Sequence, residues 1–211
     1  MARVTAEMEE PRSSEGRAEA AWHAQDYKTC ATIVLEAYGA EIYSFILAQF
    51  HGNRDQADDV FASFREDFWR GLPKFQWRCS IRAWGYRLAR NAGSRFRRAP
   101  QNRRARHVRL SEVSFLDELT ERARTTTMPH LRSEVKDEFQ RLREQLSEEE
   151  RDLLVLRVDR DLAWRDVAYA MLPAGEPADD DRLRKLEGTL RQRFVDVKRR
   201  LKLFAKEAGI L

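Results

Sequence analysis

The sequence predicts an all-α protein with two helical domains, and three observations indicate this fold class. Charged residues make up 35% of the 211 positions, whereas Gly and Pro together account for only 15. Runs of β-branched residues are scarce. Apolar residues recur at steps of three and four in both halves of the chain, which is the spacing of an amphipathic helix. A chain of 211 residues can form one large domain or two small ones.

The N-terminal half predicts a loose tail followed by a helical domain over residues 25–99. Residues 1–24 lack a helical period, so we expect a tail that is partly helical near its end. Apolar spacing predicts one helix from Tyr27 to Phe50, closed by Gly52 in a left-handed conformation. A second helix is expected to begin near Asp55 and to stop at Gly71 and Pro73.

The most unusual stretch runs from Phe68 to Ser111, because it contains no Asp or Glu, twelve Arg and one Lys. The rest of the chain has 26 basic and 35 acidic residues. Six aromatic residues lie in the first half of this stretch. Basic charge interleaved with flat rings suits single-stranded or opened nucleic acid. The alternative is a solvated basic face over core aromatics. A helix beginning near Ser80 would carry arginines on one outer face.

Residues 100–135 read as a linker, and residues 136–211 as a second helical domain. Ser147 to Glu150 form a capping-box pattern before an apolar run. A short helix and then a basic helix follow, which is the order of a helix-turn-helix. The connection from Leu172 to Leu186 is longer than the usual turn of about 3–4 residues. Either it holds an insertion, or the last helix begins near Asp180 and bends at Gly188.

The patterns of most enzymes and metal sites are absent from the sequence. There is no phosphate-binding glycine loop and no nucleophile elbow, and the four His residues are isolated. We therefore expect neither catalysis nor a metal or other cofactor. Two distant Cys residues, no signal peptide and no apolar run long enough for a bilayer favour the cytoplasm and no membrane contact.

Several motifs together resemble one protein family, the sigma factors of the sigma-70 family of extracytoplasmic-function (ECF) type. Trp84 to Asn91, read Trp-Gly-Tyr-Arg-Leu-Ala-Arg-Asn, resembles regions 2.3 to 2.4. Ala57 to Val60, with Trp69-Arg70 beyond, is similar to region 2.2. Leu146 to Arg151, Leu162 to Ala168 and Glu187 to Leu190 resemble region 4. The likeness covers residues 27–99 and 136–206, in the family's order.

The resemblance implies a bacterial transcription initiation subunit with core RNA polymerase and promoter DNA as partners. Region 2.2 would bind the β′ clamp helices, regions 2.3 to 2.4 would open and read the −10 element, and region 4 would read the −35 element beside the β flap. An anti-sigma factor is a further partner that the resemblance allows. The physics of promoter opening agrees, because a flipped base needs rings and polar edges.

The resemblance, read together with the chemistry of the side chains, assigns candidate contacts to three surfaces. Those for the −10 element are Phe75, Trp77, Arg78, Ser80, Arg87, Asn91, Ser94, Arg95 and Arg98. Those for the −35 element are Thr189, Arg191, Gln192, Arg193, Lys198 and Arg199. Those for core polymerase are Asp58, Asp59, Ala62, Ser63, Arg65 and Glu66.

The polymerase surface departs from the family pattern. Ala62 and Ser63 stand where the family usually has Gln and Glu, and Arg65 stands where it has Phe. The alternative function is therefore a helix-turn-helix transcriptional regulator that keeps the fold but no longer binds core polymerase.

Overall fold

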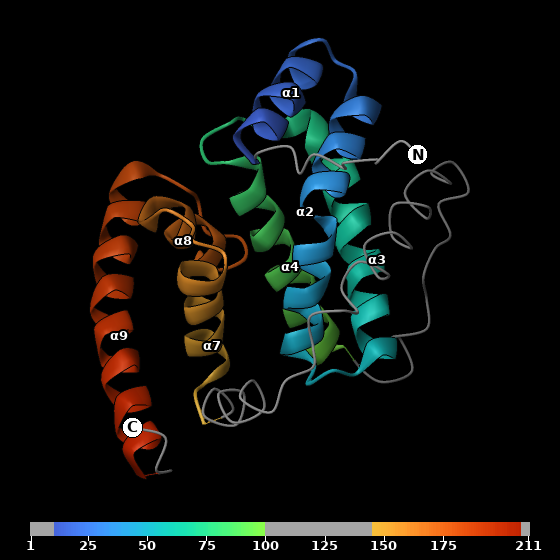
Figure 1. Cartoon of the computed structure of the whole chain (residues 1–211). Helices are drawn as coiled ribbons and strands as arrows, with labels where there is room; N and C mark the ends of the chain where they lie inside the picture. The colour runs from blue at the N-terminus through green and yellow to red at the C-terminus, as the bar shows by residue number, and fades with distance from the viewer. Residues whose placement is uncertain (1–10, 100–144, 208–211) are drawn as a thin grey trace, which may run out of the picture.

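The computed structural model describes residues 11–99 and 145–207, and all regular structure in these two ranges is helical. This confirms the all-α fold class. The N-terminal part consists of α1 (Pro11–His23), α2 (Tyr27–Gln49), α3 (Arg54–Gly71), the 3-10 turn η1 (Leu72–Lys74) and α4 (Ile81–Arg98) (Figure 1). The C-terminal part consists of α7 (Glu148–Leu154), the π-helical turn η4 (Val155–Asp159), α8 (Trp164–Met171) and α9 (Asp180–Glu207).

Helix α2 is the central helix of the N-terminal part, because its apolar side chains face α1, α3 and α4. Gly52 follows it at φ 80° and ends it in the left-handed region, as the sequence predicts. The Asn53 side chain then accepts a hydrogen bond from Gln56 N and caps α3. By length and composition α2 could cross a membrane, but 61% of this stretch is buried inside the protein, so it gives only weak support for a membrane span.

Residues 11–23 form helix α1, so the helix expected near the end of the tail is present, while the expectation of a loose tail is wrong for the rest of this segment. Ala18 is fully buried against the core, and Trp22 packs there too. The Trp22 indole donates a 2.8 Å hydrogen bond to the carbonyl oxygen of Leu72, at the start of η1. The sequence pattern indicates only part of α1, because small residues such as Ala18 supply most of its buried face and carry a weak apolar signal.

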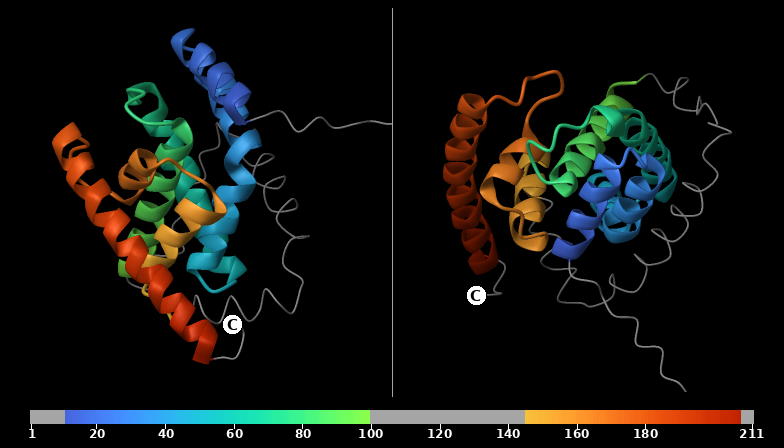
Figure 2. Two further views of the ribbon diagram at one scale, coloured as in Figure 1. Left: turned by 60° about the vertical axis from the view of Figure 1, so that its left-hand side comes forward. Right: turned by 90° about the horizontal axis from the view of Figure 1, so that it is seen from above.

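The C-terminal part lies against α4, on the side away from α3. Helix α8 packs on α4, and α9 packs on the far side of α7 and α8, so that α9 is the outermost helix (Figures 1 and 2). Buried residues of both parts form one continuous hydrophobic core. In the described residues the two parts therefore pack together as one body. The expected linker, residues 100–135, lies outside the described residues.

The long connection in the C-terminal part is explained by an early start of the last helix. Helix α9 begins at Asp180 and continues through Gly188 to Glu207. This leaves only residues 172–179 between α8 and α9. Asp179 accepts a 2.8 Å hydrogen bond from Arg182 N at the start of the helix. The predicted capping box at Ser147 is also present, because Ser147 and Glu150 exchange side-chain to backbone hydrogen bonds.

Candidate nucleic-acid interface

Helix α4 carries the basic part of the Phe68 to Ser111 stretch, and its two faces differ sharply. The Ser80 hydroxyl accepts a hydrogen bond from Ala83 N and starts the helix. Ile81, Ala89 and Ala92 are buried on the inner face. Arginines at helical spacing occupy the other face. The sequence predicts this start and this division correctly.

The aromatic loop before α4 is held in place by ring contacts. Phe75 is 5% exposed and stacks on Trp84 at 4.7 Å between ring centroids, so it is a core residue here. Trp77 is half-buried and contacts Phe75 and Trp22 at 5.0 and 6.2 Å. Its backbone has φ 52°, a strained value for a bulky residue. Of the predicted loop contacts, Arg78 is the exposed one.

The outer face of α4 is covered over part of its length. Arg87 donates from Nη2 to the carbonyl oxygen of Glu176 at 2.8 Å, and its guanidinium lies over the ring of Tyr169. Asn91 and Ser94 are half-buried. Arg95 forms an ion pair with Asp67, and Arg98 stays exposed with Nε 3.1 Å from the carbonyl oxygen of Ser94.

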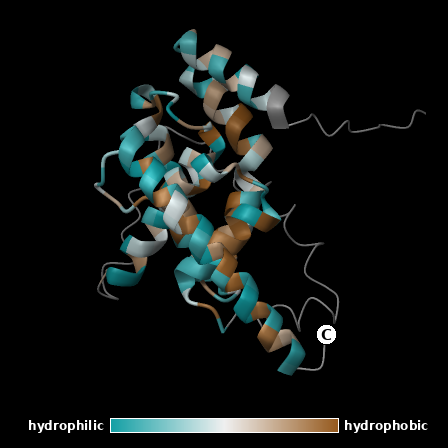
Figure 3. Ribbon diagram, turned by 90° about the vertical axis from the view of Figure 1, so that its left-hand side faces the viewer, coloured by the Kyte–Doolittle hydropathy of each residue, from teal (hydrophilic) through white to brown (hydrophobic). Residues whose placement is uncertain are grey.

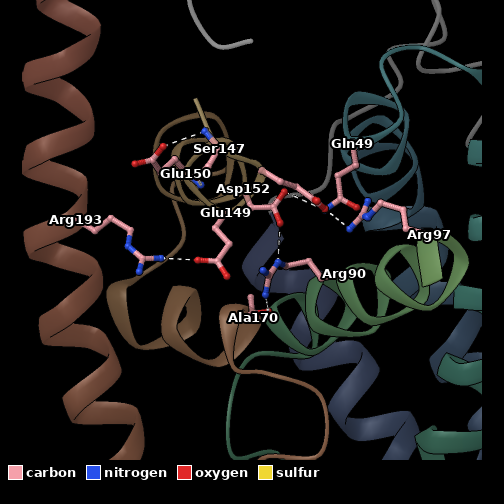
Figure 4. Close-up of polar contacts among 10 residues, drawn as sticks. Gln49, Arg90, Arg97, Ser147, Glu149, Glu150, Asp152, Ala170 and Arg193 are labelled. Atoms are coloured by element: carbon pink, nitrogen blue, oxygen red, sulfur yellow. Dashed lines mark hydrogen bonds and ion pairs between the residues drawn. The ribbon is translucent and has the colours of Figure 1, made fainter. Parts of the chain in front are cut away.

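A buried polar cluster joins α4 to α7 (Figure 4). Arg90 donates from Nε to Asp152 Oδ2 at 2.7 Å, and Gln49 donates from Nε2 to Asp152 Oδ1 at 2.9 Å. Asp152 is 3% exposed. Its burial raises the pKa of the carboxyl group, and the nearby Arg90 only partly offsets this effect. Arg97, close to the end of α4, forms an ion pair with Glu148 on α7.

Helix α9 carries a second set of exposed basic residues, and the helix lies nearest the viewer in Figure 3, where hydrophilic and hydrophobic residues alternate along it. Its inner side buries Leu183, Leu190 and Val197. The exposed residues recur at steps of three and four, as the period of a helix requires. The exposed polar and basic ones include Arg184, Lys185, Thr189, Arg191, Gln192, Lys198, Arg199, Lys202 and Lys206.

The predicted contacts of α9 do not all lie on this face. Gln192 and Lys198 are exposed, and Lys198 lies over the ring of Phe194. Arg191 is exposed beside Glu187, and Arg199 beside Asp196. Arg193 turns toward α7 and pairs with Glu149 at 2.6 Å (Figure 4). Thr189 donates its hydroxyl hydrogen bond to the carbonyl oxygen of Lys185. Arg193 is therefore a packing contact of α9 in this structure.

No protein-family model, curated protein or solved structure matches the chain. The described ranges contain no group of three or more His, Cys, Asp or Glu side chains placed to hold a metal ion.

The third candidate surface, on α3, is partly enclosed. All six residues predicted to bind core polymerase are half-buried: Asp58, Asp59, Ala62, Ser63, Arg65 and Glu66. Asp58 accepts a 2.8 Å hydrogen bond from the Tyr43 hydroxyl, and Glu66 pairs with Arg70 at 3.5 Å. Asp59, Ala62, Ser63 and Glu66 share one helical face by their spacing.

Sequence reasoning missed the residues that join the two parts. Arg90 and Asp152 lie 62 positions apart, and no sequence motif pairs one with the other. The exposed Arg184 and Lys202 were missed too, although they follow the same helical period as Arg191 and Lys198. That period was the signal that could have identified them.

Proposed function

We propose that the protein is a sigma factor of the ECF type, which directs bacterial core RNA polymerase to promoters and helps to open the −10 element. The observation that carries this proposal is the outer face of α9. It combines exposed basic and polar side chains on a long helix that follows the short helix α8. A helix of this kind fits the major groove, with phosphates held by the basic side chains.

Helix α4 and the loop before it support a role at the −10 element. Trp77 offers a half-buried ring for stacking against a flipped base, and Arg78 and Arg98 offer exposed charge for phosphates. In this proposal Phe75 and Ser80 support the loop, because one lies in the core and the other caps α4. Arg87, Asn91 and Ser94 would meet opened DNA on the outer face of α4 only in an arrangement that frees Arg87 from the C-terminal part.

Helix α3 is the proposed surface for the β′ clamp helices of core polymerase, while the C-terminal part would sit beside the β flap. The half-buried acids Asp59 and Glu66 lie on one face with Ala62 and Ser63, so this face is less charged than the family pattern. This observation favours the second candidate function, a DNA-binding regulator without polymerase contact. In both cases the protein would act in the cytoplasm, without a cofactor and without catalysis of its own.

Run-off transcription tests the proposal directly. The protein is mixed with core RNA polymerase and genomic fragments, and start sites are mapped. We expect defined transcripts that require the protein, together with its retention on immobilised core polymerase. A protein that binds duplex DNA but is not retained by the polymerase would refute the sigma factor and favour the regulator.

Two double variants locate the activity. Replacing Gln192 and Lys198 with alanine should reduce transcription from promoters that depend on an upstream element, with retention on polymerase unchanged. Replacing the two α3 acids, Asp59 and Glu66, with alanine should reduce retention on polymerase and leave duplex binding unchanged.

A further inference from the structure

We propose that the C-terminal part is a lid that covers the nucleic-acid surface of α4, and that Glu148 and Asp152 of α7 are its latch. The inference rests on the proposed function, in which α4 binds nucleic acid. The partner that competes with the lid is single-stranded DNA.

The C-terminal part occupies the arginine side chains of α4 that would donate hydrogen bonds to a phosphate backbone. Arg87, Arg90 and Arg97 follow one another along α4, and all three are engaged by groups of the C-terminal part. Arg87 donates to carbonyl oxygens between α8 and α9, whereas Arg90 and Arg97 meet carboxylates on α7. Single-stranded DNA could contact these guanidinium groups only after the C-terminal part has moved away.

The beginning of α4 is occupied in the same manner. Asp166 of α8 accepts a hydrogen bond from Ser80 N at 3.3 Å. On the other side, Glu15 of α1 accepts one from Arg82 N at 3.4 Å. Free backbone N–H groups at a helix start bind phosphate oxygens well. The carboxylates of Asp166, Asp152 and Glu148 thus lie along α4 from its first turn to its last, where DNA phosphates would lie in the open form.

Closure and DNA binding are therefore two alternatives for the same surface. A ligand that binds only the open form shows an apparent affinity reduced by the open fraction. The continuous core favours the closed form. The ion pairs of the latch add to this preference, so they help to set the fraction of molecules in which the C-terminal part has left α4. Weakening the latch should raise the apparent affinity for single-stranded DNA, although no residue of the DNA surface has changed.

The chain contains two cysteines, and the reactivity of their thiols reports opening without any introduced cysteine. Cys79 is half-buried in the loop before α4, and burial together with Asp166 of α8 raises the pKa of its thiol to about 12. Departure of α8 would remove both effects and make the thiol reactive, because the thiolate is the nucleophile. Cys30 is fully buried in α2 within the N-terminal part, so it reports unfolding of that part instead.

The test compares two pairs of substitutions on α7. The variant Glu148→Gln/Asp152→Asn weakens the ion pairs that α7 makes with Arg97 and Arg90 of α4. Both arginines lie well beyond the start of α4, next to which Cys79 is found. The control Glu149→Gln/Glu150→Gln removes the same charge from the same helix, but its partners Arg193 and Arg200 belong to α9. Iodoacetamide labelling of each cysteine is followed by mass spectrometry. Binding of a fluorescent single-stranded DNA of about 12 nucleotides is measured by anisotropy.

We expect the latch variant to label about tenfold faster at Cys79 and to bind the oligonucleotide about tenfold more tightly, in proportion to its open fraction. Cys30 and the control variant should behave as in the wild type. Unchanged labelling of Cys79 would overturn the latch, and faster labelling of both cysteines would overturn a lid that opens separately from the fold.

The measurements distinguish a failure of the lid from a failure of the proposed function. If Cys79 labels faster while oligonucleotide affinity stays the same, α4 is not an inhibited DNA surface. The inference then falls together with the −10 role of α4. If the wild type directs transcription and neither readout changes in the latch variant, the inference falls and the proposed function remains.

Discussion

Arg90 Nε lies 2.7 Å from Asp152 Oδ2, and this ion pair joins α4 to α7. Replacing Asp152 with alanine would leave a largely buried guanidinium without its acid and Gln49 without its acceptor. We expect the free energy of unfolding to fall by roughly 3 kcal/mol, as for other buried ion pairs that lose one partner. Urea unfolding followed by circular dichroism measures this change.

Glu149→Ala provides the comparison for that substitution. Glu149 is 63% exposed and pairs with Arg193 at the surface, so its loss should cost about 0.5 kcal/mol or less. Equal effects of the two substitutions would show that burial of Asp152 contributes nothing to stability.

Alanine substitutions at two glycines are expected to change the stability of the protein in opposite directions. A Cβ atom at Gly71 would lie 2.9 Å from Cζ2 of Trp84, whose ring is packed against Phe68 and Phe75. Gly71→Ala should therefore destabilise the protein by about 1–3 kcal/mol. Gly188 in α9 has open space around the same atom, so Gly188→Ala should stabilise it by up to about 1 kcal/mol. Thermal unfolding of the two variants distinguishes these signs, and a stabilising Gly71→Ala would contradict the packing described.

Stability should fall as the solution becomes alkaline. Burial raises the pKa of Cys30 from 9.0 to about 11, and that of Tyr38 from 10.0 to about 12. Both groups stay protonated longer in the folded state than in the unfolded one. The contribution of Cys30 is therefore complete below pH 9 and is lost as the pH rises toward 11, whereas that of Tyr38 is complete below pH 10 and is lost toward pH 12. For Cys30 we expect a loss of about 1 kcal/mol by pH 10.

Urea unfolding at pH 8 and pH 10 measures that loss. The Cys30→Ala variant is less stable at both values, but the difference between them should be smaller. An identical pH dependence in wild type and variant would exclude Cys30 as its source.

The outer face of α9 should determine the salt dependence of duplex binding. Lys198→Ala/Lys202→Ala removes two exposed charges, so affinity should fall equally for all sequences and the salt slope should decrease by about 1–2. Arg193→Ala removes a side chain directed at Glu149 and should leave the slope unchanged. Titrations at several salt concentrations give both slopes. A larger decrease in the salt slope from Arg193→Ala would mean that α9 binds DNA through the side that faces α7.

The sequence alone predicts the helices whose starts and stops carry strong local signals. Ser80 caps its helix, Gly52 turns the chain, and Ser147 with Glu150 forms the capping box. These features depend on a few neighbouring residues, so they can be read without tertiary structure. Helix α1 was predicted only in part, because its stability comes from packing on α2 and its small side chains give little periodic signal.

The arrangement of the two parts could not be predicted from local patterns. Contacts such as Arg87 with Glu176 and Gln49 with Asp152 join positions 89 and 103 residues apart. An arginine on an outer helical face looks the same in a sequence whether it meets phosphate, water or a carboxylate. The candidate residues on α4 were therefore identifiable as a basic face, while their partners were not.

The hydrogen bond from the Trp22 indole to the Leu72 carbonyl also decides where the chain can be shortened. The family resemblance begins at Tyr27, and a truncated chain starting there would look complete by sequence. It would leave the Leu72 carbonyl without this donor, remove the ring that packs beside Trp77 and uncover the part of α2 that α1 packs against. Minimal versions of this protein should therefore keep the whole of α1, from Pro11 onward.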